Sequence, residues 1–282
     1  MTIKRINVMK ITILTVSYNA ADTLGDAMES VRLQKREDVE LEYIVVDGGS
    51  DDGTVEMLRS EECRMRDAGV DFRWVSEHDN GLYDAMNKGL RLATGDVIGI
   101  VNADDMMASD SVIQCVAHKY AVNPELEFLY SDVRFVDRDV RLAELRNAKT
   151  RRYICPIFWH PWMLTFGYAP PHPGQYIRKS CFEKWGLYKP NYRIGADYEM
   201  NVRFVRKQMA KRAYLRQCSV AMRLGGASTK KGAAGSFIGN NYDVINANRE
   251  NGYKSSRLLI LGKLPIKAIE VIVPKVFPYI GA

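Results

Sequence analysis

The sequence has few of the residues that build metal or disulfide frameworks. Its 5 cysteines are scattered, odd in number and without a Cys-x-x-Cys pair, and its 4 histidines show no metal-ligand spacing. This pattern argues against a structural zinc site and favours a reducing compartment. No apolar stretch reaches the roughly 18 residues that a membrane-spanning helix needs. We therefore expect a cytoplasmic protein without a transmembrane segment.

Glycine-rich phosphate-binding loops are also missing. A dinucleotide-binding enzyme needs Gly-x-Gly-x-x-Gly after its first strand, so that backbone amides hold a pyrophosphate at a helix N-terminus. Here the first predicted strand, 11–16, is followed by Ser-Tyr-Asn-Ala-Ala-Asp, and no Walker A loop occurs. A divalent cation bound to carboxylates is the remaining way to hold a diphosphate.

The positive charge of the chain does not form a nucleic-acid-binding block. The net charge is +6, but lysine and arginine are spread over the second half of the chain. They are not interleaved with aromatic residues in a compact patch, so we predict no nucleic-acid partner. A dispersed basic surface suits a diphosphate or an anionic membrane surface.

Strands and helices alternate through the first 130 residues. Short apolar runs bounded by polar residues predict buried strands, and the segments between them have the spacing of amphipathic helices. This alternation predicts βαβ units and an α/β fold, with a Rossmann-like, mostly parallel sheet flanked by helices. The predicted strands are 11–16, 41–46, 72–75, 96–101 and 127–130, and the predicted helices are 21–33, 52–65, 82–93 and 109–120.

The pattern changes after residue 132. A hairpin is predicted from 133–136 and 141–145, around Asp-Arg-Asp. Residues 150–176 are rich in Pro, His, Trp and Tyr with little periodicity, and a loop of that length is usually functional. Beyond it we predict helices at 179–185, 198–208 and 236–251, a strand at 215–224, and a mobile glycine-rich loop at 225–232.

The most informative stretch is the strand 96–101, which ends in Asn-Ala-Asp-Asp. Ligands of open α/β sheets bind beyond the carboxyl ends of the strands, and this is where Asp104 and Asp105 lie. Two adjacent carboxylates repel each other unless a cation compensates, and their hard oxygens suit Mg²⁺ or Mn²⁺ together with a substrate diphosphate. The alternative is a polar loop that caps the next helix. It is less favoured because Ser109 already offers an N-cap there.

Four motifs in order give the chain a family resemblance. They are Thr15-Val-Ser-Tyr-Asn, Val46-Asp-Gly-Gly-Ser-Asp-Asp-Gly-Thr, Glu77-His-Asp-Asn-Gly-Leu-Tyr-Asp-Ala-Met-Asn-Lys-Gly and Asn102-Ala-Asp-Asp. Together they resemble family 2 glycosyltransferases, over about residues 9–230. The resemblance implies a GT-A fold, inverting transfer from a nucleotide sugar, and Mn²⁺ or Mg²⁺ as cofactor. It also implies an acceptor-side C-terminal region, followed here by a basic apolar tail.

The resemblance further implies a donor-binding set. Asp47 would accept a hydrogen bond from the base, usually uracil, and Asp79 would line the nucleotide pocket. Asp104 would be the ribose-side or metal-side member of the acidic pair, and Asp105 the direct metal ligand. The remaining donor-side residues are Thr15, Ser17, Tyr18, Asn19, Asn87 and Lys88, of which the last two could equally form a solvated helix face.

Asp197 corresponds to the family's general base. Many members have Glu-Asp where this chain has Ala196-Asp197, so the glutamate is missing. The alternative role of Asp197 is to cap the helix that follows, and the two roles are compatible. On the acceptor or diphosphate side we also expect His172, Trp162 and Tyr198; for His172, packing within the loop is an equal alternative.

The tail from residue 249 to 275 carries six Lys or Arg and two Glu, a local charge of +4. Its apolar runs are interrupted by prolines, so it suits an interfacial position on the inner face of the cell membrane. Packing on the domain or on a second subunit is the alternative. We divide the chain into a nucleotide-sugar-binding half (1–132), an acceptor-binding and catalytic-base half (133–230) and this C-terminal helical tail (231–282).

The predicted activity is inverting transfer of a sugar from a nucleotide diphosphate sugar, with UDP favoured, to a hydroxyl of a glycan or lipid-linked acceptor in surface polysaccharide synthesis. A sugar-nucleotide nucleotidyltransferase is one alternative, although that class needs a basic glycine-rich loop after the first strand. A catalytically inactive nucleotide-sugar-binding protein is another. The acidic pair and Asp197 argue against it.

Overall fold

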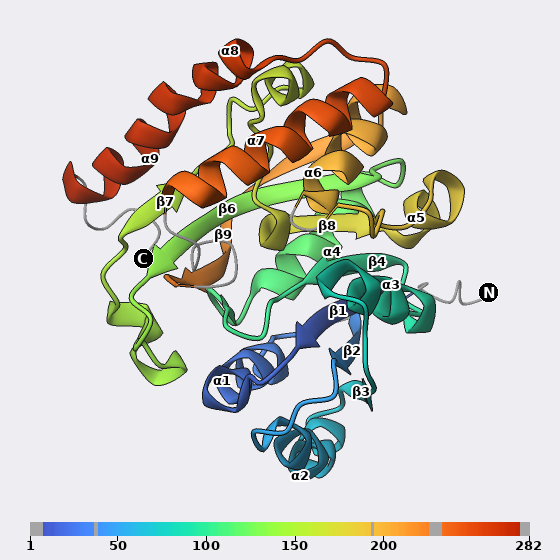
Figure 1. Ribbon diagram of the computed structural model, residues 1–282. Coiled ribbons are helices and arrows are strands. Elements are labelled where there is room, and N and C mark those ends of the chain that lie inside the picture. The colour runs from blue at the N-terminus through green and yellow to red at the C-terminus, as the bar shows by residue number, and fades with distance from the viewer. Residues whose placement is uncertain (1–7, 37–38, 193–194, 226–232, 277–282) are drawn as a thin grey trace.

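A computed structural model describes residues 8–36, 39–192, 195–225 and 233–276. In these residues the strands form one nine-stranded sheet with helices on both faces. Figure 1 shows α1 and α2 (Ala21–Arg32 and Thr54–Asp67) on one side of the molecule and the helices of the C-terminal region on the other. The predicted α/β class, with a curled sheet between helices, is confirmed.

The first half of the sheet is parallel, as predicted. Its strands run in the same direction, so their carboxyl ends lie at the same edge. β1 pairs with β2 on one side and β4 on the other, and β3 forms the outer edge beside β2. The elements are β1 (Met9–Ser17), β2 (Val39–Asp47), β3 (Asp71–Ser76), α3 (Leu82–Leu92) and β4 (Val97–Ile100).

The second half of the sheet is mixed. β8 (Gln175–Arg178) inserts antiparallel between β4 and β6 (Phe128–Val136). β9 (Arg212–Arg223) runs parallel to β6, and its far end pairs with β5 (Met106–Met107). The strand order is therefore β3-β2-β1-β4-β8-β6-β9-β5, and β7 (Arg152–Ile154) pairs with the outer part of β6. The antiparallel insertion brings the loop that precedes β8 to the carboxyl edge of β4.

The predicted hairpin after residue 132 was wrong. Val133–Val136 is the end of β6, but its antiparallel partner is β7, and Leu142–Asn147 forms a 3-10 helix instead. Leu145 packs with Met106 and Val136 in a small separate core. Burial of this side chain favours the helical turn over a strand at this position. The expected division between residues 132 and 133 thus falls within one continuous strand.

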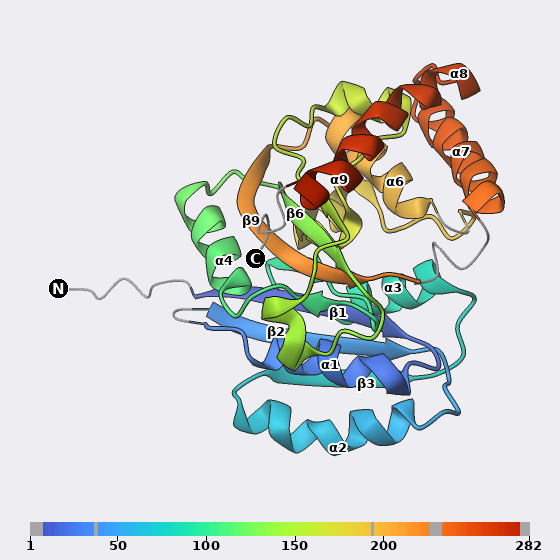
Figure 2. The same ribbon diagram turned by 90° about the vertical axis from the view of Figure 1, so that its left-hand side faces the viewer.

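Two cores lie on opposite faces of the sheet. On one face α1, α2 and α4 (Val112–Val122) bury side chains such as Ile13 of β1. On the other face α3, α5 (Lys179–Trp185), α6 (Ala196–Asn201) and α7 (Ala233–Glu250) cover side chains such as Leu14. The alternation of Ile13 and Leu14 between the faces is the period of two expected of a strand buried on both sides. Figure 2 shows α2 below the strands and α6 and α7 above them.

Two predicted helices differ at their ends. α4 begins three residues later than expected, with Ser111 as N-cap, and the Ser109 hydroxyl instead lies 3.3 Å from that of Ser111. The prediction that Ser109 caps this helix, which was used to disfavour a capping role for the acidic pair, is therefore wrong; the N-cap is Ser111. The helix predicted at 198–208 begins as α6 and continues as a π-helical segment, Val202–Lys207. Most of the predicted loop at 225–232 lies outside the described residues.

The C-terminal helices pack on the domain. α8 (Arg257–Ile260) and α9 (Leu264–Val276) follow α7, and α9 lies against β7 (Figure 1). Ile260, Lys263 and Glu270 are buried there. No helix within the described parts of the chain combines the length and apolarity needed to cross a membrane.

Candidate active site

The end of β2 is organised around Asp47. Its buried carboxylate accepts hydrogen bonds from the Ser17, Ser50 and Ser76 hydroxyls at 3.0, 2.5 and 2.7 Å, and from the backbone N–H of Gly49 and Ser50 at 3.1 and 2.9 Å. Burial alone would raise the pKa of Asp47, but these bonds outweigh it and leave the pKa lowered. Since a carboxylate offers about four lone-pair sites, a nucleotide base would share or replace one of these donors.

The Tyr18 and Asp79 side chains both lie close to Gly48. A Cβ atom at Gly48 would approach Asp79 Oδ2 to 2.6 Å and Tyr18 Cδ2 to 3.4 Å, so glycine permits this close approach. Asp79 Oδ1 accepts a hydrogen bond from Gly81 N at 2.7 Å, which fixes the start of α3. The Tyr18 side chain is 68% exposed. These two side chains are accessible to a ligand at the carboxyl edge of β1–β3.

Asn19 ties two loops together. It has a left-handed backbone, with φ of 48°, and its amide oxygen accepts a hydrogen bond from Asp51 N at 3.1 Å. Its own N–H donates to Ser50 Oγ at 2.8 Å. Asparagine tolerates this backbone conformation better than most residues do. The loop after β1 is thus held against the loop after β2.

Three other residues expected to bind the donor have their polar atoms engaged within the protein. The Thr15 hydroxyl, buried in β1, donates to Val101 O at 2.6 Å. The Asn87 amide bonds the backbone of Tyr188 twice, at 2.8 and 3.0 Å. Lys88 Nζ lies 2.9 Å from His78 O and 2.8 Å from a Glu77 oxygen.

The acidic pair follows β4 on a tight turn. Asp105 is 1% exposed, and its oxygens accept from Asn102 Nδ2 at 2.7 Å and from Arg223 N at 3.2 Å. Burial and the neighbouring Asp104 carboxylate raise the pKa of Asp105, and the bonds from Asn102 and Arg223 offset only part of this. Asp104 is half-buried, and its carboxylate has no hydrogen-bond partner among the described residues. The accessible carboxylate of the pair is therefore Asp104.

Arg223, which the motifs do not single out, holds this turn. Its buried guanidinium donates to Asp104 O at 3.1 Å, to Val140 O at 2.9 Å and to Asp26 Oδ2 at 2.6 Å. A planar guanidinium can reach three acceptors at once, which an ammonium group cannot do in the same geometry. The sequence signal is a cation that directly follows the short apolar run 220–222 near the end of the predicted strand.

Asp197 lies in the first turn of α6, opposite the start of α3. The Tyr83 hydroxyl donates to Asp197 Oδ1 at 3.0 Å, which aims the carboxylate. Burial raises the pKa of Tyr83, and the Asp197 charge raises it further, so Tyr83 stays protonated as a donor. Tyr83 is a second residue that sequence reasoning did not assign to the site, although it lies within the third motif.

His172 belongs to the same cluster. Its Nε2 lies 2.8 Å from the Tyr188 hydroxyl, and the two rings pack edge to face. Burial lowers the pKa of His172, and the Asp197 carboxylate offsets only part of this effect. The neutral imidazole therefore lies beside the candidate base.

The two other acceptor-side residues differ in their surroundings. Tyr198 is buried, and its hydroxyl donates to Leu164 O and accepts from Asn248 Nδ2 at 2.9 Å, so it joins α6 to α7. Trp162 is 50% exposed and packs edge to face on Phe166. Trp162 does not line the pocket around Asp197.

That pocket has a volume of about 230 Å³. It is walled by β7, by the loop that leads to β8, by α6 and by α9. Its lining is Arg152, Ile154, Gly167, Tyr168, Ala169, Pro170, Pro171, His172, Asp197, Tyr198, Asn201, Lys267 and Glu270. Residues from the predicted functional loop at 150–176 thus meet the candidate base.

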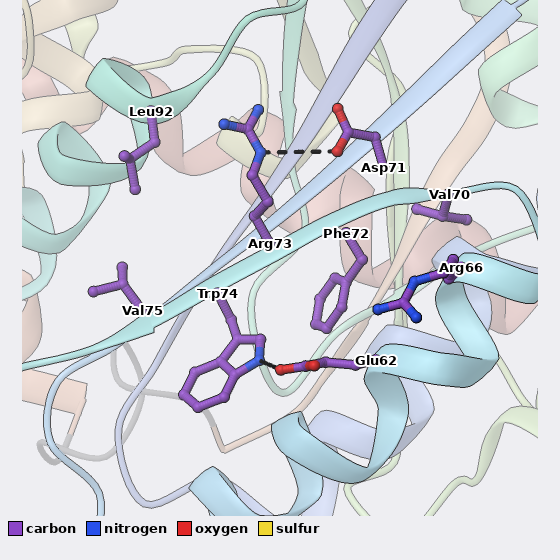
Figure 3. Close-up of a pocket in the computed structure, with 9 residues that line it drawn as sticks. All are labelled: Glu62, Arg66, Val70, Asp71, Phe72, Arg73, Trp74, Val75 and Leu92. Carbon is purple, nitrogen blue, oxygen red and sulfur yellow. Dashed lines mark hydrogen bonds and ion pairs between the residues drawn. The ribbon is translucent and has the colours of Figure 1, made fainter.

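A larger pocket, of about 670 Å³, lies along the edge strand β3 (Figure 3). Two pairs of its polar groups are in contact: Trp74 Nε1 donates to Glu62 at 2.7 Å, and Arg73 faces Asp71 at 3.9 Å. It flanks the sheet instead of opening at the carboxyl ends of the strands, where ligands of such sheets bind. We therefore do not regard it as the active site.

The residues at the acidic turn fit a divalent cation only in part. Among the described residues, no group of three His, Cys, Asp or Glu could hold a metal ion. The turn nevertheless supplies hard oxygens, and the pKa of Asp105 is raised first by burial and then by the Asp104 charge, which a cation would offset. A cation here would need further oxygens from a bound diphosphate.

The geometry defines a class of protein. Polar loops meet at the carboxyl edge of a parallel sheet, an acidic turn closes its central strand, and a single tyrosine-held carboxylate faces a pocket on the other half. The family model "Glycosyl transferase family 2" matches residues 12–161. The chain belongs to this family and is a glycosyltransferase.

Relatives of known sequence agree. An uncharacterized glycosyltransferase of Mycobacterium tuberculosis is 32% identical over 195 residues, 68% of each chain. A PGL/p-HBAD biosynthesis glycosyltransferase of Mycobacterium bovis BCG is 27% identical over the same length and shares of both chains.

Solved structures share the fold. S. aureus TarS in complex with UDP has a TM-score of 0.60 at 12% identity, over 91% of this chain and 71% of that one. The mannosyltransferase PcManGT of Pyrobaculum calidifontis, in complex with GDP-Man and Mn²⁺, has a TM-score of 0.60 at 17% identity, over 94% and 75%. The GT-A fold predicted from the motifs is confirmed.

The neutral His172 predicts a pH dependence of stability. Its folded pKa is lowered, so below about pH 6.5, the usual value for histidine, the unfolded chain takes up a proton that the folded chain resists. The free energy of unfolding should therefore fall as the pH drops below that value. Urea unfolding of His172→Gln should show a flatter pH dependence. The exposed-histidine control His118→Gln should keep the wild-type slope; an equal change in both would contradict the assignment.

Proposed function

We propose that this chain is an inverting glycosyltransferase that uses a nucleotide diphosphate sugar, with UDP-sugar as first choice, and a hydroxyl of a glycan or lipid-linked acceptor. The observation that carries the proposal is the position of Asp197. Its carboxylate, aimed by Tyr83, lies in a pocket, and the acidic turn lies separately at the carboxyl edge of the sheet. The relative named for PGL/p-HBAD biosynthesis supports a role in making envelope glycoconjugates.

For the donor, we propose that the base and ribose contact the exposed Tyr18, the half-buried Asp79 and the loop organised by Asp47. Asp104 is the better candidate for the cation contact, because its carboxylate is only half-buried and accepts no hydrogen bond from the residues that the structure describes. Asp105, first expected to be the direct ligand, is buried and bonded on both oxygens, so it positions the turn. When bound, the cation would offset the charge of the diphosphate.

For the transfer step, Asp197 takes the proton of the acceptor hydroxyl as the oxygen attacks the anomeric carbon. The new carbon–oxygen bond forms as the bond to the diphosphate breaks, and the electron pair of that bond leaves with the diphosphate. One base on the face opposite the leaving group is sufficient for inversion. A retaining hydrolase would need two carboxylates about 5 Å apart.

The acidic pair gives the first test of this proposal. Asp104→Asn should abolish the strengthening of UDP binding by Mn²⁺, because it removes the accessible charge. Asp105→Asn should weaken it by about 10- to 100-fold, as expected for a supporting residue. Titration calorimetry with UDP, with and without Mn²⁺, measures both. If Asp105→Asn abolished the strengthening of UDP binding by Mn²⁺ and Asp104→Asn behaved like wild type, Asp105 would be the direct ligand of the cation.

The base gives the second test. Asp197→Asn keeps the shape of the side chain but cannot take a proton, so transfer should fall by at least about a hundredfold while UDP binding persists. Tyr83→Phe should lower the rate less and shift its pH profile, since Tyr83 acts through Asp197. Near-wild-type transfer by a folded Asp197→Asn would show that another residue is the base. Binding of UDP without transfer to any acceptor by wild type would favour the inactive alternative.

For the tail, we propose peripheral binding to anionic membranes. The buried Ile260, Lys263 and Glu270 show that one side of α8–α9 packs on the domain. The other side leaves Leu258 and Ile269 79% and 57% exposed. Such an apolar surface on a basic segment suits the membrane interface. Truncating the tail would also remove its buried contacts, so surface substitutions are the cleaner test.

The third test therefore replaces Leu258, Leu261 and Ile269 together by serine. Sedimentation with vesicles of phosphatidylglycerol and phosphatidylcholine should show loss of binding, with an unchanged unfolding temperature. The electrostatic share, on the order of 1 kcal/mol per basic residue near the surface, should fade with salt. A control variant, Val122→Ser, alters an exposed apolar residue of α4 and should still bind. Equal binding by all proteins would remove the membrane from the proposal.

A further inference from the structure

The C-terminal helix supplies part of the wall of the pocket that contains the candidate base. Lys267 and Glu270 of α9 line it together with Arg152 of β7 and with Asp197 of α6. Asp197 and Lys267, which are 70 positions apart in the chain, thus line the same small pocket. At about 230 Å³ it is below the usual range for drug-sized ligands, roughly 300–1,000 Å³, and suits one terminal unit of an acceptor.

Most of the charges in this pocket already have partners. Arg152 Nε donates to Glu270 Oε2 at 2.8 Å, and the Tyr168 hydroxyl donates to Glu270 Oε1 at 3.1 Å. Asp197 accepts from Tyr83. Arg152 and Glu270 thereby compensate each other, and the carboxylate of Asp197 is oriented from outside the pocket.

Lys267 is different, because it has no ion pair or hydrogen bond within the described parts of the chain. Partial desolvation lowers its pKa, and the charge of Arg152 lowers it further; Glu270 offsets only part of this. Lys267 is nevertheless exposed, so its ammonium group can be reached by a ligand that enters the pocket. An anionic ligand group would offset the repulsion between Lys267 and Arg152.

The donor diphosphate is not the anionic group that we expect Lys267 to bind. The residues of the acidic turn, Asp104 and Asp105, do not line the pocket, and neither do the donor-loop residues Tyr18 and Asp79. The pocket contains the candidate base instead. Its ligand is therefore the molecule whose hydroxyl Asp197 deprotonates.

We propose that Lys267 is a specificity-determining residue that binds an anionic group, a phosphate or a carboxylate, on the terminal unit of the acceptor. The inference rests on the proposed function and deepens it, because it names the acceptor class. A hydroxyl of that unit faces Asp197 while its anionic group meets Lys267. α9 is then part of the acceptor site as well as a packing element.

The experiment measures acceptor-side binding by saturation-transfer NMR in the presence of UDP and Mn²⁺. The probes are glucose 1-phosphate, glucuronate and the neutral methyl glucoside. Wild type should bind one of the two anionic probes at least about tenfold more tightly than the neutral probe, and which one it prefers distinguishes phosphate from carboxylate. Lys267→Met and Lys267→Gln should lose this preference, and Lys267→Arg should keep it.

Lys254→Met is the matched control, since it removes the same charge from an exposed position of the tail outside the pocket. It should retain the wild-type preference. The inference is overturned if wild type shows no anionic preference, including no detectable binding of either anionic probe, or if Lys267→Met retains it. UDP binding is measured separately. Its absence in wild type would contradict the proposed function, whereas UDP binding without anionic preference would contradict the role of Lys267 alone.

Discussion

The buried guanidinium of Arg223 is the interaction on which the candidate donor site most depends. It lies at the end of β9, yet it bonds Asp26 of α1 and the backbone of Asp104, and its N–H bonds Asp105. The Arg223–Asp26 pair is almost fully removed from water, and losing one partner of such a pair typically costs about 3–5 kcal/mol. The mixed half of the sheet therefore fixes the turn that follows the central strand β4 of the parallel half.

The candidate base depends on a comparable set of buried polar contacts. Asn87 bonds the backbone of Tyr188, and the Tyr188 hydroxyl meets His172. Nearby, Glu199 pairs with Arg203 at 3.0 Å inside the helical segment that carries Asp197. The Asn87 contact joins α3 to the second half of the chain, and the other two stabilise that half around the candidate base. A transferase needs this rigidity because its two substrates must meet in one geometry.

The parallel half of the fold could be predicted closely from hydrophobic periodicity and motif order. β1, β2, β3 and β4 lie where the apolar runs predict them; β1, β2 and β4 are buried over most of their length and must be apolar there, whereas β3 is a partly exposed edge strand. The second half was predicted less well. Nothing near residue 133 indicates that β7 pairs with β6, since that pairing depends on a segment almost 20 residues further along. Similarly, Ser109 is a residue type favoured at an N-cap, but α4 begins at Val112.

The sequence by itself determined the family, the α/β class, and the positions of Asp47, Asp79, the acidic pair and Asp197, because local motifs at strand ends report chemistry directly. Only the tertiary structure decided which of these residues are accessible to a ligand and which support others. It buried Asp105 and left Asp104 accessible, engaged Asn87 and Thr15 in internal bonds, and added Arg223 and Tyr83 to the site. It also placed Lys267 of the tail in the lining of the pocket that contains Asp197. Burial and pairing arise from contacts between distant segments, which no local pattern of residues records.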